Sequence, residues 1–457
     1  MREEIEVRPS ASIFIGLILG LIALNWLWAV VLFIGFFVWV RGLGRRFLLG
    51  GSFLAGLAFS PTPAAMLQVA EPLHGVGTIS SVPVLYSDAQ VCEVSAGGRH
   101  LVLTLPRDPP AMLGDEIRVS GIAKPLDVVR TRFRPYESVQ GKIRLERFEI
   151  VREGSWIAHL ADGWRRSFMA FLGQNLSPKS ASLVDALCFN SRSMLDTATR
   201  REMAESGTVH MVSASGLQVF ILGALLALFI RLFPLPRVVQ ISLLASLLAV
   251  YCLAAGLQPQ IVRAALVTLF GLTAYLVRRD PDALSALALS GVAYLLWRPE
   301  AVYELAFQLS FVTVGCIALF FRRSPSRSAG VKDDLTRWGR DFLRVSGVIL
   351  LATTPLIAYY LGVVSVVSVF ANLLVFWCLP LIVGIAFVSH ASWLVAPPLG
   401  EAIASRLLAS LAHWIFGVLD RLGDGSWTLQ VPGFSPLWLV AFYGAWLMTY
   451  RRRIVRP

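Results

Sequence analysis

Charged residues are scarce in this chain. Only 15% of the 457 residues are Asp, Glu, Lys or Arg, whereas 56% are hydrophobic. Soluble domains carry about 25% charged residues, which cover the surface that faces water. The composition therefore excludes an ordinary soluble protein. Repeated apolar runs, long enough to cross a hydrocarbon core of about 30 Å, predict a polytopic α-helical membrane protein.

Cysteines and metal-binding motifs are equally sparse. The five cysteines show no metal-ligand spacing. Cys252, Cys316 and Cys378 lie in apolar runs, where packing roles are expected. Cys92 and Cys188 lie in more polar sequence, and spacing alone leaves open whether they form a disulfide. Because the chain also lacks HExxH and Walker motifs, we expect no metal, no cofactor and no enzymatic activity.

Positive charge gathers in short loops beside the apolar runs. The net charge is +12. Cytoplasmic loops of membrane proteins collect Lys and Arg, so the pattern indicates topology rather than a nucleic-acid patch. The main clusters are Arg41/Arg45/Arg46, Arg322/Arg323/Arg327 and Arg451/Arg452/Arg453.

Changes in composition divide the chain into four parts. Residues 1–62 hold N-terminal membrane segments, and residues 63–152 are a polar insertion. Residues 153–209 predict amphipathic connecting helices, and residues 210–457 hold most of the membrane segments. The basic loop at 41–46 is expected on the cytoplasmic side, which places the insertion outside the cytoplasm.

The insertion alternates apolar and polar residues in short runs separated by Gly and Pro turns. Such runs occur at 89–94, 100–105, 116–121 and 142–151. About five strands in a segment of this length predict a small antiparallel barrel, for which an OB-like fold is the natural candidate. Barrels of this type often bind single strands. Acidic and basic residues balance across the insertion, so a nucleic-acid face and an ordinary solvated face remain open. The basic candidates are Lys124, Arg130, Arg132, Arg134, Lys142 and Arg144.

Residues 155–209 read as helices. Apolar residues from Ile157 to Leu172 recur every three or four positions, which predicts a helix on the membrane surface or on the barrel. Ser177-Pro178 is expected to begin the next helix. Asp196-Thr197 is expected to cap a third helix that runs towards Ser206-Gly207.

Beyond residue 210 the apolar runs follow closely. We expect spans near 212–233, 238–256, 261–277, 283–298, 302–321 and 343–361. Residues 365–396 form either one span or a half-helix and a span broken at Pro380. Residues 403–420 look interfacial. The side of the membrane that holds the C-terminus stays open.

Several polar residues enter this apolar half and are candidates to shape a path. The first group lies in the stretch 207–219, at the start of the long apolar region. No acidic residue follows there to orient the histidine, so a Ser-His catalytic pair is disfavoured. Arg263 and Glu304 are expected to enter from the same side, where pairing and separate snorkelling are equally plausible. The full set is His210, Ser213, Ser215, Gly216, Gln218, Arg263, Glu304, Gln308 and Asn372.

These segments resemble, in order and spacing, the membrane channel subunit of bacterial competence, the ComEC family. The stretch from His210 to Val219 is similar to that family's H-L-x-A-x-S-G-L-H-V, and Pro259 with 262–266 is similar to its P-x-x-x-R-A segment. Residues 304–311 resemble D-P-x-F-Q-L-S-F. Thr354-Pro355, 371–374 and Pro380 fit the later segments.

The resemblance implies passage of single-stranded DNA across the inner or cytoplasmic membrane during natural transformation. It also implies an outer DNA receptor protein, a cytoplasmic motor ATPase and the lipid bilayer as partners. Gln218 stands where the family motif has a second histidine. Many members continue into a metallo-β-lactamase-like domain that this sequence lacks, so a nuclease would come from a separate chain.

Two other functions fit the same composition. One is a transporter of another polar or anionic solute, and the other is a non-conducting membrane scaffold that assembles a surface complex through the barrel. Pore path, oligomeric state and energy source are left open by the sequence.

Overall fold

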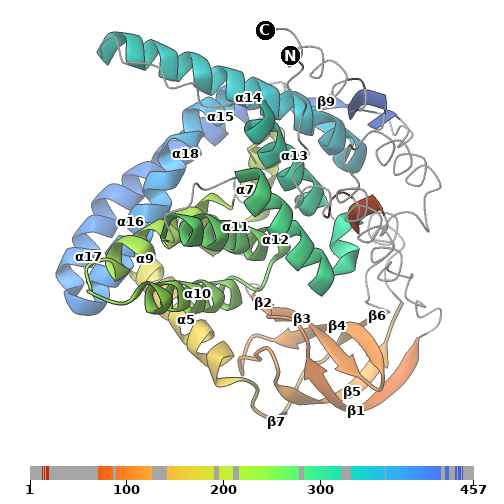
Figure 1. Cartoon of the computed structure of the whole chain (residues 1–457). Coiled ribbons are helices and arrows are strands. Elements are labelled where there is room, and N and C mark those ends of the chain that lie inside the picture. The colour runs from red at the N-terminus through yellow and green to blue at the C-terminus, as the bar shows by residue number, and fades with distance from the viewer. Residues whose placement is uncertain are drawn as a thin grey trace. The chain divides into compact units, whose positions relative to one another are not determined.

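The computed structural model describes residues 13, 15, 17–19, 70–85, 89–125, 141–189, 195–208, 216–276, 283–303, 305–320, 331–365, 367–423, 428–431, 438–439, 441–443 and 445. These residues form a β domain followed by helices (Figure 1). The chain divides into two compact units. The first unit comprises Met1–Ser60, Asp282–Val369 and Ser426–Pro457, and the second comprises Pro61–Pro281 and Phe370–Gly425. The N-terminal membrane segments expected at 1–62 lie almost wholly outside the described residues.

The β domain is a single sheet. Its strands are β1 (Glu71–Ile79), β2 (Val84–Leu85), β3 (Ala89–Ala96), β4 (Arg99–Pro106), β5 (Glu116–Ala123), β6 (Gly141–Arg144) and β7 (Ile150–Arg152). The runs expected at 89–94, 100–105 and 116–121 are confirmed as β3, β4 and β5, whereas the run expected at 142–151 is divided between β6 and β7. Their order is β6-β4-β3-β1-β5-β7, with β2 paired to β3. Alternate residues of β3 and β4 are buried, as the period of two requires.

The sheet closes on itself beside β6. Lys124, directly after β5, and Lys142 in β6 exchange backbone N–H···O bonds of 2.7 and 2.8 Å. β4 and β6 run parallel, whereas the other pairings are antiparallel. The enclosed core is aliphatic, with Val94, Leu101 and Ile117 fully buried. The β domain is therefore a small closed barrel with its own hydrophobic core.

Helices α5 (Trp156–Asn175), α6 (Pro178–Phe189) and α7 (Thr197–Glu205) follow the barrel. Two expected starts are confirmed: α6 begins at Pro178, and the Asp196 carboxylate accepts the Thr199 N–H at 2.7 Å. The expectation of a surface position holds only in part. α6 is buried from Leu183 to Phe189, and α5 packs Phe168 into the helical core.

The remaining helices of the second unit surround this core. They are α9 (Leu217–Ile230), α10 (Arg237–Ala254), α11 (Pro259–Leu276), α15 (Ser368–Phe376), α16 (Cys378–Val395), α17 (Pro397–Ile403), the π-helix η3 (Ala404–Leu408) and α18 (Ala409–Leu422). Phe168 and Phe189 meet edge to face at 5.1 Å between ring centroids, and Phe387 and Tyr251 pack beside them. An aromatic cluster therefore joins α5, α6, α10 and α16.

The first unit contains α12 (Ala283–Trp297), η2 (Pro299–Tyr303), α13 (Leu305–Phe320), α14 (Val331–Leu361), β8 (Val363–Ser365) and β9 (Thr428–Gln430). Tyr294 of α12 stacks on Phe307 of α13 at 6.1 Å between ring centroids. β8 and β9 pair antiparallel. α14 begins at Val331, well before the expected span at 343–361, so part of the sequence between the expected spans at 302–321 and 343–361 is helical.

Within the described part of the chain, three helical segments are long and apolar enough to cross a membrane: Arg237–Ala254, Phe370–Val395 and Pro397–Leu422. Shorter apolar helices occur at Leu217–Ile230, Gln260–Ala274, Ser285–Trp297, Phe307–Cys316 and Gly347–Tyr360. Their positions agree with the expected spans, and the mostly helical membrane architecture with a β domain is confirmed.

Candidate functional site

Two of the motif segments noted in the sequence meet at the starts of α9 and α11. Gly216 precedes α9 with φ +55°, a left-handed backbone that favours glycine. A Cβ on Gly216 would lie 2.7 Å from the Ala264 Cβ. Further along, a Cβ on Gly223 would lie 2.7 Å from Thr268 Cγ2. Because both contacts occur in the same order, α9 and α11 run side by side in the same direction.

Polar side chains are buried where these two helices begin. Gln218, Gln260 and Arg263 are 4%, 5% and 3% exposed. Gln260 Nε2 donates to Gln258 Oε1 at 2.9 Å, in the turn that leads into α11. We call Gly216, Gln218, Gln260, Arg263 and Ala264 the helix-start site.

The electrostatics of the helix-start site favour an anion. The N-terminus of a helix carries about half a positive charge from its unsatisfied N–H groups. Two parallel helix starts lie together here, and Arg263 adds a full positive charge close by. A cation at a helix N-terminus does not stabilise the helix, because that end of the helix is itself positive. The combination of helix N-termini with a cation is, however, suited to bind phosphate.

Four other candidates from the sequence, His210, Ser213, Ser215 and Glu304, lie outside the described residues. The expected pairing of Arg263 with Glu304 therefore stays a prediction. Gln308 belongs to the first unit, where its Nε2 donates to the Val302 carbonyl at 3.0 Å.

Asn372 lies in α15, upstream of the expected break at Pro380. Its Oδ1 is buried and has no hydrogen-bond partner among the residues that the structure describes. A break occurs, but at Trp377 rather than at Pro380: α15 ends at Phe376, α16 begins at Cys378, and Pro380 lies in the first turn of α16. The Leu374 carbonyl, near this break, accepts the Trp414 indole N–H at 2.9 Å. The Trp414 side chain of α18 therefore gives a hydrogen bond to a backbone carbonyl that the interrupted helix leaves unpaired.

The barrel brings together part of the basic set. Lys124 and Lys142 stand opposite each other where the sheet closes, and Arg144 follows on β6. Lys124 and Arg144 are exposed. Like charges placed opposite each other on strands are destabilising unless an anion or solvent screens them. Arg130, Arg132 and Arg134 lie outside the described residues.

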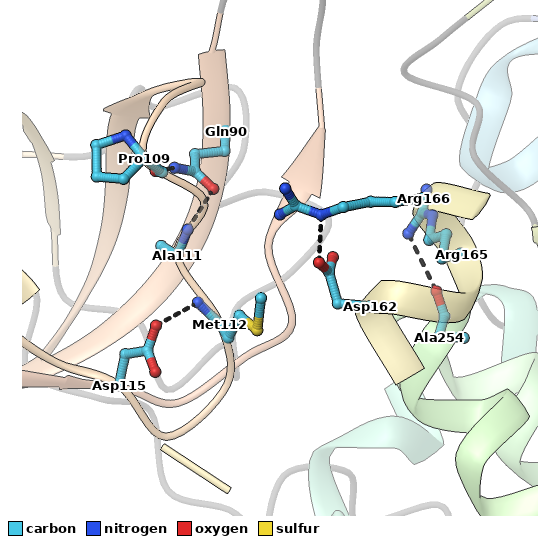
Figure 2. A network of polar contacts seen from close by, with 9 residues as sticks. All are labelled: Gln90, Pro109, Ala111, Met112, Asp115, Asp162, Arg165, Arg166 and Ala254. Carbon is cyan, nitrogen blue, oxygen red and sulfur yellow. Dashed lines mark hydrogen bonds and ion pairs between the residues drawn. The ribbon is translucent and has the colours of Figure 1, made fainter. Parts of the chain in front are cut away.

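Two buried polar side chains of the barrel shape the loop between β4 and β5 (Figure 2). Gln90 Nε2 donates to the carbonyls of Pro106 and Pro109, each at 2.8 Å, while its Oε1 accepts the Ala111 N–H at 3.0 Å. The Asp115 carboxylate accepts N–H groups from Met112 and from Gly154 at the start of α5, both at 2.7 Å. Every one of these bonds is internal, so they support a structural role.

A small cleft lies between this loop and the helices. Its helical wall carries Arg165, which donates to the Ala254 carbonyl at 3.2 Å, and Arg166, which pairs with Asp162 (Figure 2). The cleft joins the barrel to α5 and α10. Because the polar groups in Figure 2 are engaged with one another, we assign it to the attachment of the barrel.

Two buried charged residues, Arg165 and Asp185, were not recognised as candidates from the sequence. Arg165 of α5 is 8% exposed and its guanidinium lies 5.8 Å from the Phe189 ring centroid, while Asp185 lies one turn before Phe189 on α6 and is 3% exposed. Such residues are costly in an apolar core and are functional candidates. The signal in the sequence was a charge within the apolar face of each helix.

The cysteines are all free and buried, so Cys92 and Cys188 do not form a disulfide. Burial raises the pKa of the Cys92 thiol to about 12. Among the residues that the structure describes, no group of His, Cys, Asp and Glu could hold a metal ion.

Comparisons with known proteins place the chain in a family. Over 211 residues it is 31% identical to ComE operon protein 3 of Bacillus subtilis, covering 46% of this chain and 26% of that protein. Over 251 residues it is 26% identical to Recombination protein 2 of Haemophilus influenzae, covering 51% of this chain and 32% of that protein. The matched part thus spans about a quarter to a third of each relative. No solved structure matches the chain.

The family model described as Competence protein matches residues 187–456. That range contains the helix-start site, Gln308, Asn372 and all three candidate membrane spans. It covers more than half of the sequence, and the motifs within it occur in the expected order. The chain belongs to the Competence protein family.

Proposed function

We propose that the chain forms the membrane part of a conduit that carries single-stranded DNA into the cytoplasm during natural transformation. Membership of the Competence protein family supports this function. We place the protein in the inner or cytoplasmic membrane as a multi-pass protein. Its three candidate spans and shorter apolar helices support that location.

The observation that carries the proposal is the burial of Arg263 beside two parallel helix starts. Arg263 is 3% exposed, and its neighbour Ala264 contacts Gly216 at the start of α9. A buried guanidinium that adds to the positive ends of two helices suits a passing phosphate. A strand that crosses a bilayer needs such groups along a polar path, since its charge cannot enter lipid.

Close packing limits where the strand passes. The contacts of Gly216 with Ala264 and of Gly223 with Thr268 leave no room for a polymer between α9 and α11. We therefore assign Arg263, Gln218 and the undescribed His210, Ser213 and Ser215 to the mouth of the path. Glu304, Gln308 and Asn372 remain candidates for its further course.

We propose that the barrel is OB-like, lies outside the cytoplasm and guides the strand to this mouth. Its closed sheet, the parallel pairing of β4 with β6 and the antiparallel closure at Lys124 and Lys142 support the assignment. The exposed cations at this closure suit a phosphate backbone. Arg130, Arg132 and Arg134 follow Lys124 in the sequence and extend the basic segment.

We propose no enzymatic activity for these residues. The partners that we propose are an outer DNA receptor protein, a cytoplasmic motor ATPase and a nuclease. The energy for movement would come from the motor. Two alternative functions are a transporter of another anionic solute and a non-conducting scaffold. Both predict that the protein is present in the membrane but does not itself carry DNA into the cell.

The test measures labelled DNA that becomes protected from external nuclease inside cells. A strain without this protein is expected to lose the protected DNA, and the wild-type protein to restore it. Arg263→Ala is expected to lower uptake by about tenfold, the scale of one charge-assisted hydrogen bond. Arg237→Ala is the matched control, because Arg237 is exposed at the start of α10. Wild-type uptake by Arg263→Ala at equal protein level would remove Arg263 from the path, and normal uptake in the deletion strain would overturn the function.

A further inference from the structure

The last helical segment of the second unit combines the length of a membrane span with a polar face. α17, η3 and α18 follow one another without a loop over Pro397–Leu422, 26 residues whose most apolar 18-residue stretch has a mean hydropathy of 1.5. A segment of that length can cross the hydrocarbon core. The sequence pattern instead suggested an interfacial helix at 403–420.

This segment runs antiparallel to α15 and α16. At one end, a Cβ on Gly400 would lie 2.5 Å from the Trp393 Cβ. At the other end, Trp414 donates to the Leu374 carbonyl at 2.9 Å, and its ring lies 5.9 Å from that of Trp377. The blue helices α15 to α18 lie side by side accordingly (Figure 1). The two segments therefore occupy the same depth along most of their length.

The partner segment must lie in lipid. Phe370–Val395 has 26 residues, and its most apolar 18-residue stretch has a mean hydropathy of 2.3. Each of its exposed residues is apolar, including Phe370, Leu381, Val388 and Leu394. Since the neighbouring segment matches it from end to end, Pro397–Leu422 crosses the membrane too. An interfacial position would lift the apolar partner out of the hydrocarbon.

The exposed surface of Pro397–Leu422 nevertheless has a polar side, which lies beside the exposed apolar residues Leu399, Leu407 and Trp414. The hydroxyls of Ser405 and Ser410 donate to the carbonyls of their own helix. Arg406, Ser410 and His413 follow at spacings of four and three, which places them on one face. The exposed polar and charged residues are Glu401, Ser405, Arg406, Ser410, His413, Asp420 and Arg421.

The charges along this face are ordered. Glu401 lies near one end, and Asp420 with Arg421 lies near the other. No acidic residue occurs between Glu401 and Asp420, whereas Arg406 and His413 lie in that interval. The central part of the face thus carries a cation, an imidazole and hydroxyl groups. These groups suit a polyanion and would be costly against lipid.

We propose that the face formed by Ser405, Arg406, Ser410 and His413 is a water-filled wall of the path, along which the DNA backbone moves. We call this face the polar stripe. The identity of the strand rests on the proposed function, whereas the presence of water along the stripe does not. Arg406 contacts phosphates in turn, and the His413 imidazole replaces part of their hydration.

Thiol labelling tests for water along the stripe. Ser410→Cys is compared in intact membranes with Val388→Cys, since Val388 is exposed on the apolar face of α16. A water-soluble maleimide reacts with thiolate, which forms in water and not in lipid. We expect Ser410→Cys to be labelled at least tenfold faster than Val388→Cys. The parent protein supplies the background, because its five cysteines are buried.

The labelling result decides the first half of the proposal. Equal, slow labelling of Ser410→Cys and Val388→Cys would overturn it, because the stripe would then be dry. Spontaneous disulfide-linked dimers of Ser410→Cys would also overturn it, since a second copy of the chain would then cover the face. Labelling of both His413→Cys and Ser405→Cys would support the proposal, because water would then reach the stripe along its length.

A transport assay decides the second half. Arg406→Ala is expected to lower the rate of DNA entry severalfold at unchanged protein level, with Arg421→Ala as the control near the end of the segment. Maleimide on Ser410→Cys is expected to block entry. Fast labelling with normal DNA entry in both experiments would overturn the DNA assignment of the stripe. A deletion strain that still takes up DNA would instead remove the proposed function, whatever the labelling shows.

Discussion

Gly216 lies so close to Ala264 that only a hydrogen fits between the starts of α9 and α11: a Cβ at Gly216 would stand 2.7 Å from the Ala264 Cβ. The contact joins two motif segments that are separated in sequence. It also fixes the two positive helix ends beside Arg263. The helix-start site therefore depends on the absence of a side chain as much as on the groups present.

Gly216→Ala is expected to destabilise the membrane part by about 1–3 kcal/mol through overpacking, with a further cost of about 1 kcal/mol because φ at Gly216 is positive. The measurement is thermal unfolding in detergent, followed by DNA uptake. Gly163→Ala is the control, because nothing lies within 4 Å of its Cβ position. Equal unfolding temperatures of the two variants would show that the contact between Gly216 and Ala264 is not tightly packed.

Trp414→Phe is expected to weaken the junction of α15 and α16. The ring remains, but the Leu374 carbonyl loses the N–H donor that it accepts at 2.9 Å. An unsatisfied polar group in an apolar setting costs about 1–3 kcal/mol. Thermal unfolding measures the change. Trp156→Phe serves as the control, since Trp156 is 73% exposed, and an equal effect at both positions would argue against a specific role of the indole N–H.

Gln90→Met is expected to loosen the loop that faces α5. Methionine has a similar shape but leaves the carbonyls of Pro106 and Pro109 and the Ala111 N–H without the fully buried amide. Each lost partner costs about 1–3 kcal/mol where water cannot replace it. Limited proteolysis of the full-length protein in membranes should cut between β4 and β5 faster. Gln174→Met, on the exposed side of α5, should leave the cutting rate unchanged.

The Cys92 thiol is expected to resist alkylation at pH 8 in the folded protein and to react after unfolding. Burial holds its pKa at about 12, so almost no thiolate forms. Because the folded state keeps its proton longer than the unfolded state, stability falls as pH rises from about 9 towards 12, by up to about 1.4 kcal/mol per pH unit. Mass spectrometry of the Cys92 peptide follows the reaction. Cys92→Ala removes this contribution to the alkaline slope, and rapid native labelling at pH 8 would contradict the assignment.

Local patterns predicted much of the fold. The scarcity of charge indicated a membrane protein, and alternation located β3, β4 and β5. Asp196 and Ser177-Pro178 marked two helix starts because capping depends only on neighbouring residues. β1 was not recognised, since it exposes most of its residues and carries Gly75 and Gly77, which blur the alternation.

The candidate site was predictable only as a set of residues. Sequence motifs named Gly216, Gln218 and Arg263, and the structure brings these three together while Gln308 lies in the other unit. The expectation for 403–420 shows the limit most clearly. An amphipathic helix reads the same whether its polar face meets bulk water or a path inside the membrane, and only its neighbours distinguish the two.

The sequence by itself determined which segments are helices or strands and that most of them belong in lipid, because periodicity and hydropathy report on the residues near one another in the chain. Tertiary structure decided which segments meet. The Gly216–Ala264 contact, the Trp414–Leu374 bond and the polar stripe beside an apolar helix depend on packing between distant segments. Such contacts leave no local signature, since a small residue or a lone tryptophan is compatible with many partners.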